Sequence, residues 1–131
     1  FLHYFQAGAD LNNSAQELKN ILRLAQNKTL ASELSSSWGV YLETVLPQKY
    51  ILFKGQSYSQ RDAALDKTHL LPGRIEFYQI SLAGSGSEVV FQKITGTTQN
   101  YGSVSLRMKS DHNQVGTIHV DGSGRIQIEK R

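Results

Sequence analysis

Residues 11–29 read LNNSAQELKNILRLAQNKT, a stretch whose apolar positions recur at steps of four and three. At 100° per residue these positions fall within an arc of about 80°, which predicts one buried stripe on an amphipathic helix. We expect the helix over residues 10–34, with Asp10 or Asn13 capping its start and the serines at 35–37 ending it. The positions predicted to pack on the rest of the domain are Leu11, Ala15, Leu18, Leu22, Ala25 and Thr29.

From Trp38 onward the sequence has the character of a β domain. Short runs of β-branched and aromatic residues alternate with turns rich in glycine and serine, which is typical of antiparallel strands. Residues 55–72 are polar and irregular, and we expect them to form a long loop. About seven strands are predicted, over residues 38–43, 49–54, 74–82, 88–93, 103–108, 115–120 and 125–130.

The last three predicted strands alternate most regularly between apolar and polar residues. Val104, Leu106 and Met108 share one face, and Ser103, Ser105 and Arg107 lie on the other. A period of two with one apolar face indicates a sheet that packs against the core on one side and is exposed to solvent on the other. The N-terminal helix is the large element available to cover the apolar face, with or without a second sheet. We therefore predict one α+β domain over residues 1–131, helix first and β domain at 38–131.

The amino-acid composition and the spacing of polar residues exclude several kinds of functional site. The chain has no cysteine, which excludes disulfides and thiolate chemistry, and no run approaches the roughly 18 apolar residues of a membrane-spanning helix. His119 and Asp121 are spaced like a catalytic base and its orienting carboxylate. They are equally explained as two solvent-facing residues that precede a turn. Asp62 and Asp66 lack the alternating carboxylates of a calcium loop. We expect no catalytic residues, no metal site and no cofactor.

Two groups of surface residues are candidates for macromolecular contacts. Leucines outside the helical stripe are candidates for contact with another subunit, although isolated exposed leucines are common; they are Leu24, Leu30 and Leu34. Basic residues toward the C-terminus could neutralise DNA phosphates, or could simply protect a sheet edge from pairing with another chain. These residues are Arg107, Lys109, Arg125, Lys130 and Arg131.

Three segments resemble a known family. Residues 17–27 (ELKNILRLAQN) resemble the second half of the long helix in minor pilins and pseudopilins, and 38–42 (WGVYL) resembles the strand that follows it. Residues 116–128 (GTIHVDGSGRIQI) look like the closing hairpin of these proteins, with its Gly-Arg turn. The likeness is nearest to the H-type pseudopilins of type II secretion and the related minor type IV pilins.

The resemblance implies a pilin-like fold and a structural, non-enzymatic role in assembling a type IV pilus or a type II secretion pseudopilus. Expected partners are other major and minor pilin or pseudopilin subunits, and the expected location is the bacterial cell envelope. Family members begin with a methylated phenylalanine and an apolar half-helix with glutamate at its fifth position. This sequence has Phe5 there and Asp10 interrupts the apolar run, so we expect the inner-membrane anchor to lie outside it. The alternatives are a surface-exposed minor pilin that binds extracellular DNA, and a small hydrolase or ligand-binding β domain unrelated to pili.

Overall fold

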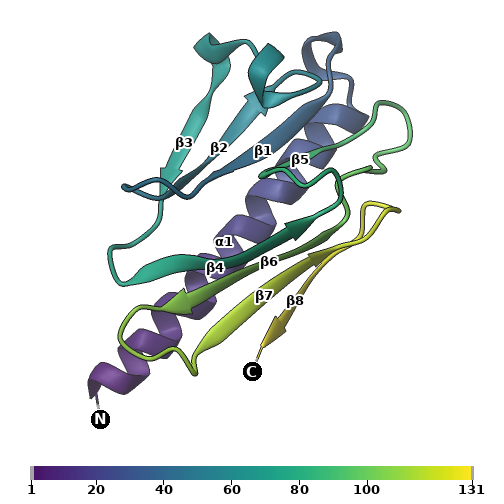
Figure 1. Cartoon of the computed structure of the whole chain (residues 1–131). Coiled ribbons are helices and arrows are strands. Elements are labelled where there is room, and N and C mark those ends of the chain that lie inside the picture. The colour runs from purple at the N-terminus through teal and green to yellow at the C-terminus, as the bar shows by residue number, and fades with distance from the viewer. Residues whose placement is uncertain (1, 131) are drawn as a thin grey trace.

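The computed structural model describes the backbone of residues 2–130 and the side chains of residues 9–129. One long helix lies along two antiparallel sheets (Figure 1), which confirms the predicted α+β class. The elements are α1 (Leu2–Leu30), η1 (Glu33–Ser35), β1 (Trp38–Glu43), β2 (Lys49–Lys54), η2 (Tyr58–Gln60), η3 (Ala63–Leu65), β3 (Lys67–Leu70), β4 (Ile75–Leu82), β5 (Glu88–Val90), β6 (Gly102–Met108), β7 (Val115–Val120) and β8 (Ile126–Lys130).

Helix α1 has 29 residues and a length of about 44 Å at 1.5 Å per residue. Its predicted bounds, 10–34, were wrong at both ends. The helix begins before Asp10, because no proline interrupts the residues that precede it. Asp10 therefore lies inside the helix, where it pairs with Arg74 at 3.4 Å. At the other end Ser32 and Leu34 adopt positive φ angles of 51° and 53°, which a continuing helix excludes.

Within residues 2–130, eight strands form two four-stranded sheets, which we call sheet A (β3-β2-β1-β5) and sheet B (β4-β6-β7-β8). The extra strand is β3, which lies within the predicted loop 55–72 and pairs with β2. Its residues are mostly exposed, because it is an edge strand, so it carries no apolar alternation that would reveal it. The predicted strand 88–93 ends at Val90, although Phe91 still bridges to Thr98. The hairpin predicted at 115–130 is present as β7–β8.

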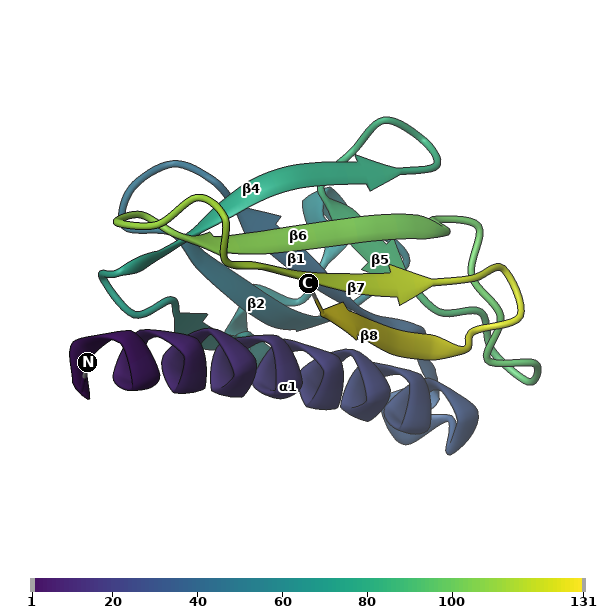
Figure 2. The ribbon, with the colours of Figure 1, turned by 90° about the horizontal axis from the view of Figure 1, so that it is seen from below.

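One core joins α1 to both sheets. The six residues of the helical stripe are buried, none exposing more than 7% of its surface. The inward residues of sheet A that meet them include Val40 and Leu52, and those of sheet B include Leu106 and Ile118. Figure 2 shows α1 lying beneath the strands, with its opposite side open to solvent. None of the helices in the described residues is long and apolar enough to span a membrane.

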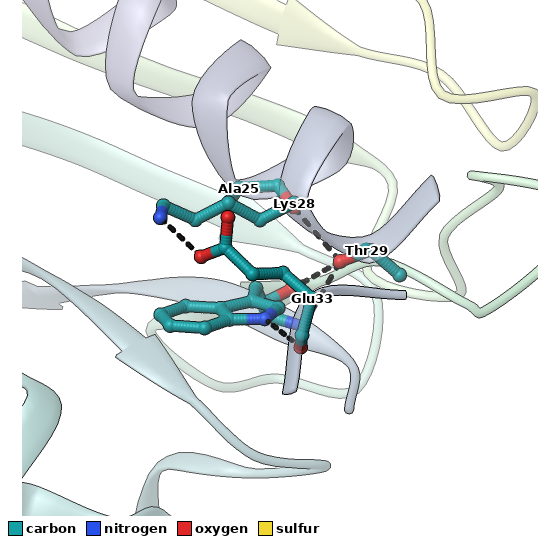
Figure 3. A network of polar contacts seen from close by, with 5 residues as sticks. Ala25, Lys28, Thr29 and Glu33 are labelled. Carbon is teal, nitrogen blue, oxygen red and sulfur yellow. Dashed lines mark hydrogen bonds and ion pairs between the residues drawn. The ribbon is translucent and has the colours of Figure 1, made fainter. Parts of the chain in front are cut away.

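The junction between α1 and β1 is fixed by buried polar contacts (Figure 3). The hydroxyl of Thr29 donates to Ala25 O at 2.8 Å and accepts from the backbone N–H of Trp38 at 2.9 Å. The indole N–H of Trp38 donates to Glu33 O at 3.0 Å. Lys28 pairs with the Glu33 carboxylate and lies 4.7 Å from the centre of the indole ring. These buried polar groups all have hydrogen-bond partners, and the bonds fix the direction in which the chain passes from α1 into β1.

A second polar contact ties α1 to two loops. The amide of Gln26 donates to Gly96 O and Gly124 O, both at 2.9 Å. Gly124 has φ +92°, and a Cβ there would overlap Gly96 O and Gln26 Nε2. The C-terminal half of α1 therefore holds the β5–β6 connection and the β7–β8 turn together.

Candidate functional site

The uncovered face of α1 carries an unusual row of side chains. At 100° per residue the row spans about 80° and is centred opposite the buried stripe. Its members are Asn13, Gln16, Asn20, Leu24 and Asn27, all exposed. Gln16 donates to Asn20 at 3.2 Å along the row. We call these five residues the outward row.

The outward row has no charged member. Between residues 9 and 29 the five charged side chains all fall outside its arc, with Glu17 and Arg23 nearest on either side. A helix face that serves only to contact water usually carries charged residues, whereas the centres of protein interfaces are depleted of them. Leu24, 40% exposed, is the apolar member of the row. The outward row thus shares its lack of charge with the centres of protein interfaces.

Leu30 and Leu34, the other leucines proposed for subunit contact, do not share this face. Leu30 lies about 120° around the helix from Leu24, and Leu34 lies beyond the end of α1. The Leu30 side chain is about 3.0 Å from where a Cβ of Gly96 would stand, and Lys93 donates to Ser35 O at 3.2 Å. The structure therefore brings Leu30 and Leu34 close to the loop that carries Ile94.

Ile94 was missed by sequence reasoning. Its side chain is 86% exposed and its φ is +74°, an uncommon conformation for a β-branched residue. Ile94 belongs to the loop that Leu30 approaches at Gly96, and we group the exposed residues Leu30, Leu34 and Ile94 as the helix-end patch. The signal that would have revealed it is an isoleucine between Lys93 and Thr95 in an otherwise polar turn.

A second apolar surface lies at the opposite end of the sheets. It surrounds a recess of about 120 Å³ between the β1–β2 turn and the β3–β4 connection. Its largely exposed apolar side chains are Val45, Leu46 and Leu70; we call them the turn patch. The Arg74–Asp10 ion pair places this patch on the side of the N-terminal half of α1. The apolar run Val45-Leu46-Pro47 between two strands was its sequence signal.

The structure separates Arg125 from the other described basic candidates, because Lys109 and the backbone of Lys130 lie at the same end of sheet B as Arg107. Arg107 faces Val115 and Arg125 follows the far end of β7, so the two are separated by about 17 Å along the strand at 3.4 Å per residue. Arg107 is also neutralised by Glu76 at 2.7 Å. Lys109 lies at the Arg107 end, beyond β6. Arg131 and the side chain of Lys130 lie outside the described residues.

The titratable residues considered for chemistry have structural partners. His119 lies 3.4 Å from Glu129, and the carboxylate of Asp121 accepts from the backbone of Ser123 and Arg125. The hydrogen bond from Ser123 and these backbone contacts lower the pKa of Asp121. Burial, together with the nearby Glu17, raises the pKa of Tyr50.

The two loop carboxylates are also engaged. Asp62 caps η3 through Ala64 N–H, and Asp66 accepts from Arg61 at 2.8 Å. In the residues that the structure describes, no group of three or more histidines or carboxylates could hold a metal ion.

Comparison with known proteins rests on structure. No protein-family model matches the chain, and no curated protein matches it in sequence. Two crystal structures of the type IV minor pilin FimU of Pseudomonas aeruginosa (strain PAO1) are similar, each 17% identical in sequence. The form in space group P65 has a TM-score of 0.65 and aligns over 91% of this chain and 92% of its own. The form in space group P21 has a TM-score of 0.69, with 95% and 92% coverage. The chain therefore has the fold of a type IV minor pilin.

Proposed function

We propose that the chain is a non-catalytic minor pilin subunit that takes part in assembling a type IV pilus, and that the outward row of α1 contacts neighbouring subunits. The observation that carries the proposal is the absence of charge along an exposed face that holds Asn13, Asn20 and Leu24. Neutral amides can form hydrogen bonds across a helix contact without burying a charge, which would be costly.

The helix-end patch and the turn patch support an open assembly. They lie at opposite ends of the molecule and consist of different residues. A contact between the helix-end patch of one subunit and the turn patch of the next would therefore join two unlike surfaces. Contacts between unlike surfaces are heterologous, and they generate filaments when the rotation does not close a ring. In this proposal the subunit belongs to the bacterial cell envelope, is anchored to the inner membrane by a helix preceding the described one, and has other major and minor pilins as partners.

A subunit of a type II secretion pseudopilus is the nearest alternative, since its assembly would use the same kind of surfaces. Deletion of the gene in its own bacterium separates the two. We expect a loss of surface pili with secretion unchanged. Loss of protein secretion with normal piliation would instead favour the pseudopilus. DNA binding has less support, because Arg107 is paired with Glu76 and lies far from Arg125.

The absence of cysteine from the chain permits a direct test of the outward row. Asn20→Cys would carry a single maleimide-benzophenone label, which reacts on illumination with whatever lies beside it. Gln60→Cys, exposed on η2, is the matched control. Both variants are expressed in the native bacterium in place of the wild-type protein, and covalent adducts are identified by mass spectrometry.

We expect the Asn20→Cys variant to form an adduct with another pilin subunit that the Gln60→Cys variant does not form. The proposal fails if piliation is normal and the label at residue 20 captures no pilin. It also fails if both positions capture the same proteins to the same extent.

A further inference from the structure

The outer face of sheet B is uncovered and its side chains are arranged in rows across the strands. Ser103, His119 and Gln127 are register neighbours on β6, β7 and β8. At the end of this face lies a recess of about 290 Å³, bounded by Tyr101 and the β7–β8 turn. Its other walls are His119, Asp121, Arg125 and Gln127. The subunit contacts proposed above do not use it.

Tyr101 gives the recess an aromatic wall that is held in place. Its side chain is 56% exposed, while its backbone carbonyl accepts from Ala83 N–H at 2.8 Å. The ring edge lies against Gly122, about 4.0 Å from where a Cβ of that residue would stand. Gly122 is itself fixed, because its carbonyl accepts from Thr98 N–H at 3.1 Å. The backbone that carries the ring is therefore fixed beside the recess, and the exposed ring offers a ligand a surface for stacking.

The polar walls are also organised before any ligand arrives. With its amide oxygen turned toward Arg125, Gln127 accepts from Nε at 3.2 Å and from Nη2 at 2.9 Å. The Oδ1 atom of Asp121 accepts from the backbone N–H groups of Ser123 and Arg125, both at 3.1 Å. The guanidinium group still has N–H groups that are not used by Gln127, and Asp121 keeps a second carboxylate oxygen. Donors and acceptors thus lie side by side beside the ring of Tyr101.

The charge of the recess indicates what it selects. Arg125 and Asp121 balance one another, and the lining includes no lysine. Binding of a nucleic-acid backbone would require several unopposed cations, so this balance disfavours it. A sugar ring presents C–H groups on one face, which pack on an aromatic ring, and hydroxyl groups around its rim, which need both donors and acceptors.

We propose that the recess beside Tyr101 binds a neutral sugar unit, such as a hexose or an N-acetylhexosamine at an end or branch of a surface polysaccharide. The sugar stacks on the ring of Tyr101, Arg125 donates to its hydroxyl oxygens, and Asp121 accepts from its hydroxyl groups. Single-sugar sites of this openness bind weakly, so the expected affinity is in the millimolar range, about −4 kcal/mol.

The test is a two-dimensional ¹H–¹⁵N NMR titration of the full 131-residue chain. The probes are glucose, galactose, mannose, N-acetylglucosamine, N-acetylgalactosamine, lactose and chitobiose, and a ten-residue oligothymidine forms a separate arm. We expect at least one sugar to shift the amide signals of residues 101, 119, 122 and 127 while those of α1 do not move. Tyr101→Ala should weaken this binding about tenfold, whereas Tyr101→Phe should preserve it.

Tyr78→Ala is the matched control, because Tyr78 is a half-exposed tyrosine at the other end of the same face. The spectrum of each variant reports whether it is folded. The proposal is overturned if no sugar in the panel shifts the recess signals of the folded wild-type chain, or if Tyr78→Ala weakens binding as much as Tyr101→Ala. Preferential, salt-dependent shifts with oligothymidine would also overturn it, in favour of a nucleic-acid site.

Discussion

The outer faces of the two sheets carry the same small motif with different surroundings. On sheet A the guanidinium of Arg61 lies 3.8 Å from the ring centre of Tyr58 and pairs with Asp66. On sheet B the guanidinium of Arg107 lies 4.5 Å from the ring centre of Tyr78 and pairs with a carboxylate in the same way. An arginine, a tyrosine and an acid are therefore not enough to decide whether a sheet face is buried.

The difference lies in what the tyrosine covers. Tyr58 stacks on Tyr41 with ring centres 3.8 Å apart and meets Phe53 edge-on at 5.6 Å, so the loop after β2 closes a second apolar layer. Tyr78 remains 50% exposed, and among residues 9–129 no aromatic ring stacks beneath it. The strand sequences differ in the same way. Strand β2 reads KYILFK and is apolar on both faces, whereas β7 reads VGTIHV and presents Thr117 and His119 to solvent.

The largest expected effect follows from removing the centre of the covered face. Phe53→Ala should lower the free energy of unfolding by about 3–5 kcal/mol, because the ring is fully buried and fills the space over Gly39. Chemical denaturation measures the change. Gln127→Ala, on the open face of sheet B, should change stability by no more than about 0.5 kcal/mol. Equal effects of the two substitutions would show that the faces do not differ as described.

The two tyrosines give a closer comparison of the same contrast. Tyr58→Ala should destabilise the protein by about 2 kcal/mol, since it removes two aromatic contacts and uncovers Phe53. Tyr78→Ala removes a half-exposed ring that contacts Arg107 and should cost less than about 1 kcal/mol. Thermal unfolding of both variants under one condition gives the comparison, which would be reversed if Tyr78 were the more important residue.

The smallest effect concerns alkaline pH. Burial raises the pKa of Tyr41 above its ordinary value of 10.0, and Glu43 and Tyr58 add to the shift. Because the folded pKa is the higher one, the associated stability is fully present below pH 10.0 and is lost as the pH rises through the folded pKa. Tyr41→Phe should therefore show a shallower fall in melting temperature between about pH 9 and 11 than the wild type. A parallel fall in both proteins would contradict this assignment.

Local periodicity made part of this fold predictable. The stripe from Leu11 to Thr29 and the alternation in β6–β8 are properties of neighbouring residues. The structure buries the residues that these patterns place inside, except Ile128, which is partly buried. The division into two sheets depends on pairing between distant segments, such as β1 with β5, which no local pattern contains. Strand β3 was missed because Lys67, Thr68 and Leu70 are exposed at a sheet edge, where polar residues and strand structure coexist.

The exposed surfaces at and beyond the end of the helix follow less directly from the sequence, for identifiable reasons. Leu24 stands out in the sequence because it lies outside the stripe, whereas the row to which it belongs is seen only when the neutral amides on the same face are taken together. Leu30 and Leu34 were grouped with it on a helix extended to residue 34. The left-handed conformations of Ser32, Leu34 and Ser35 redirect that segment, and Ile94 adopts one in its own loop. Such conformations at ordinary residues leave no mark in the sequence.

The contacts around Trp38 have a practical consequence. The chain contains one tryptophan, and its indole is almost fully buried where α1 meets β1, bonded to Glu33 and covered by Lys28. Its fluorescence therefore reports on a single place, the attachment of the helix to the β domain. A change in emission as subunits associate would mean that the helix shifts against its own domain, whereas constant emission would mean that the subunit enters its assembly as a rigid body.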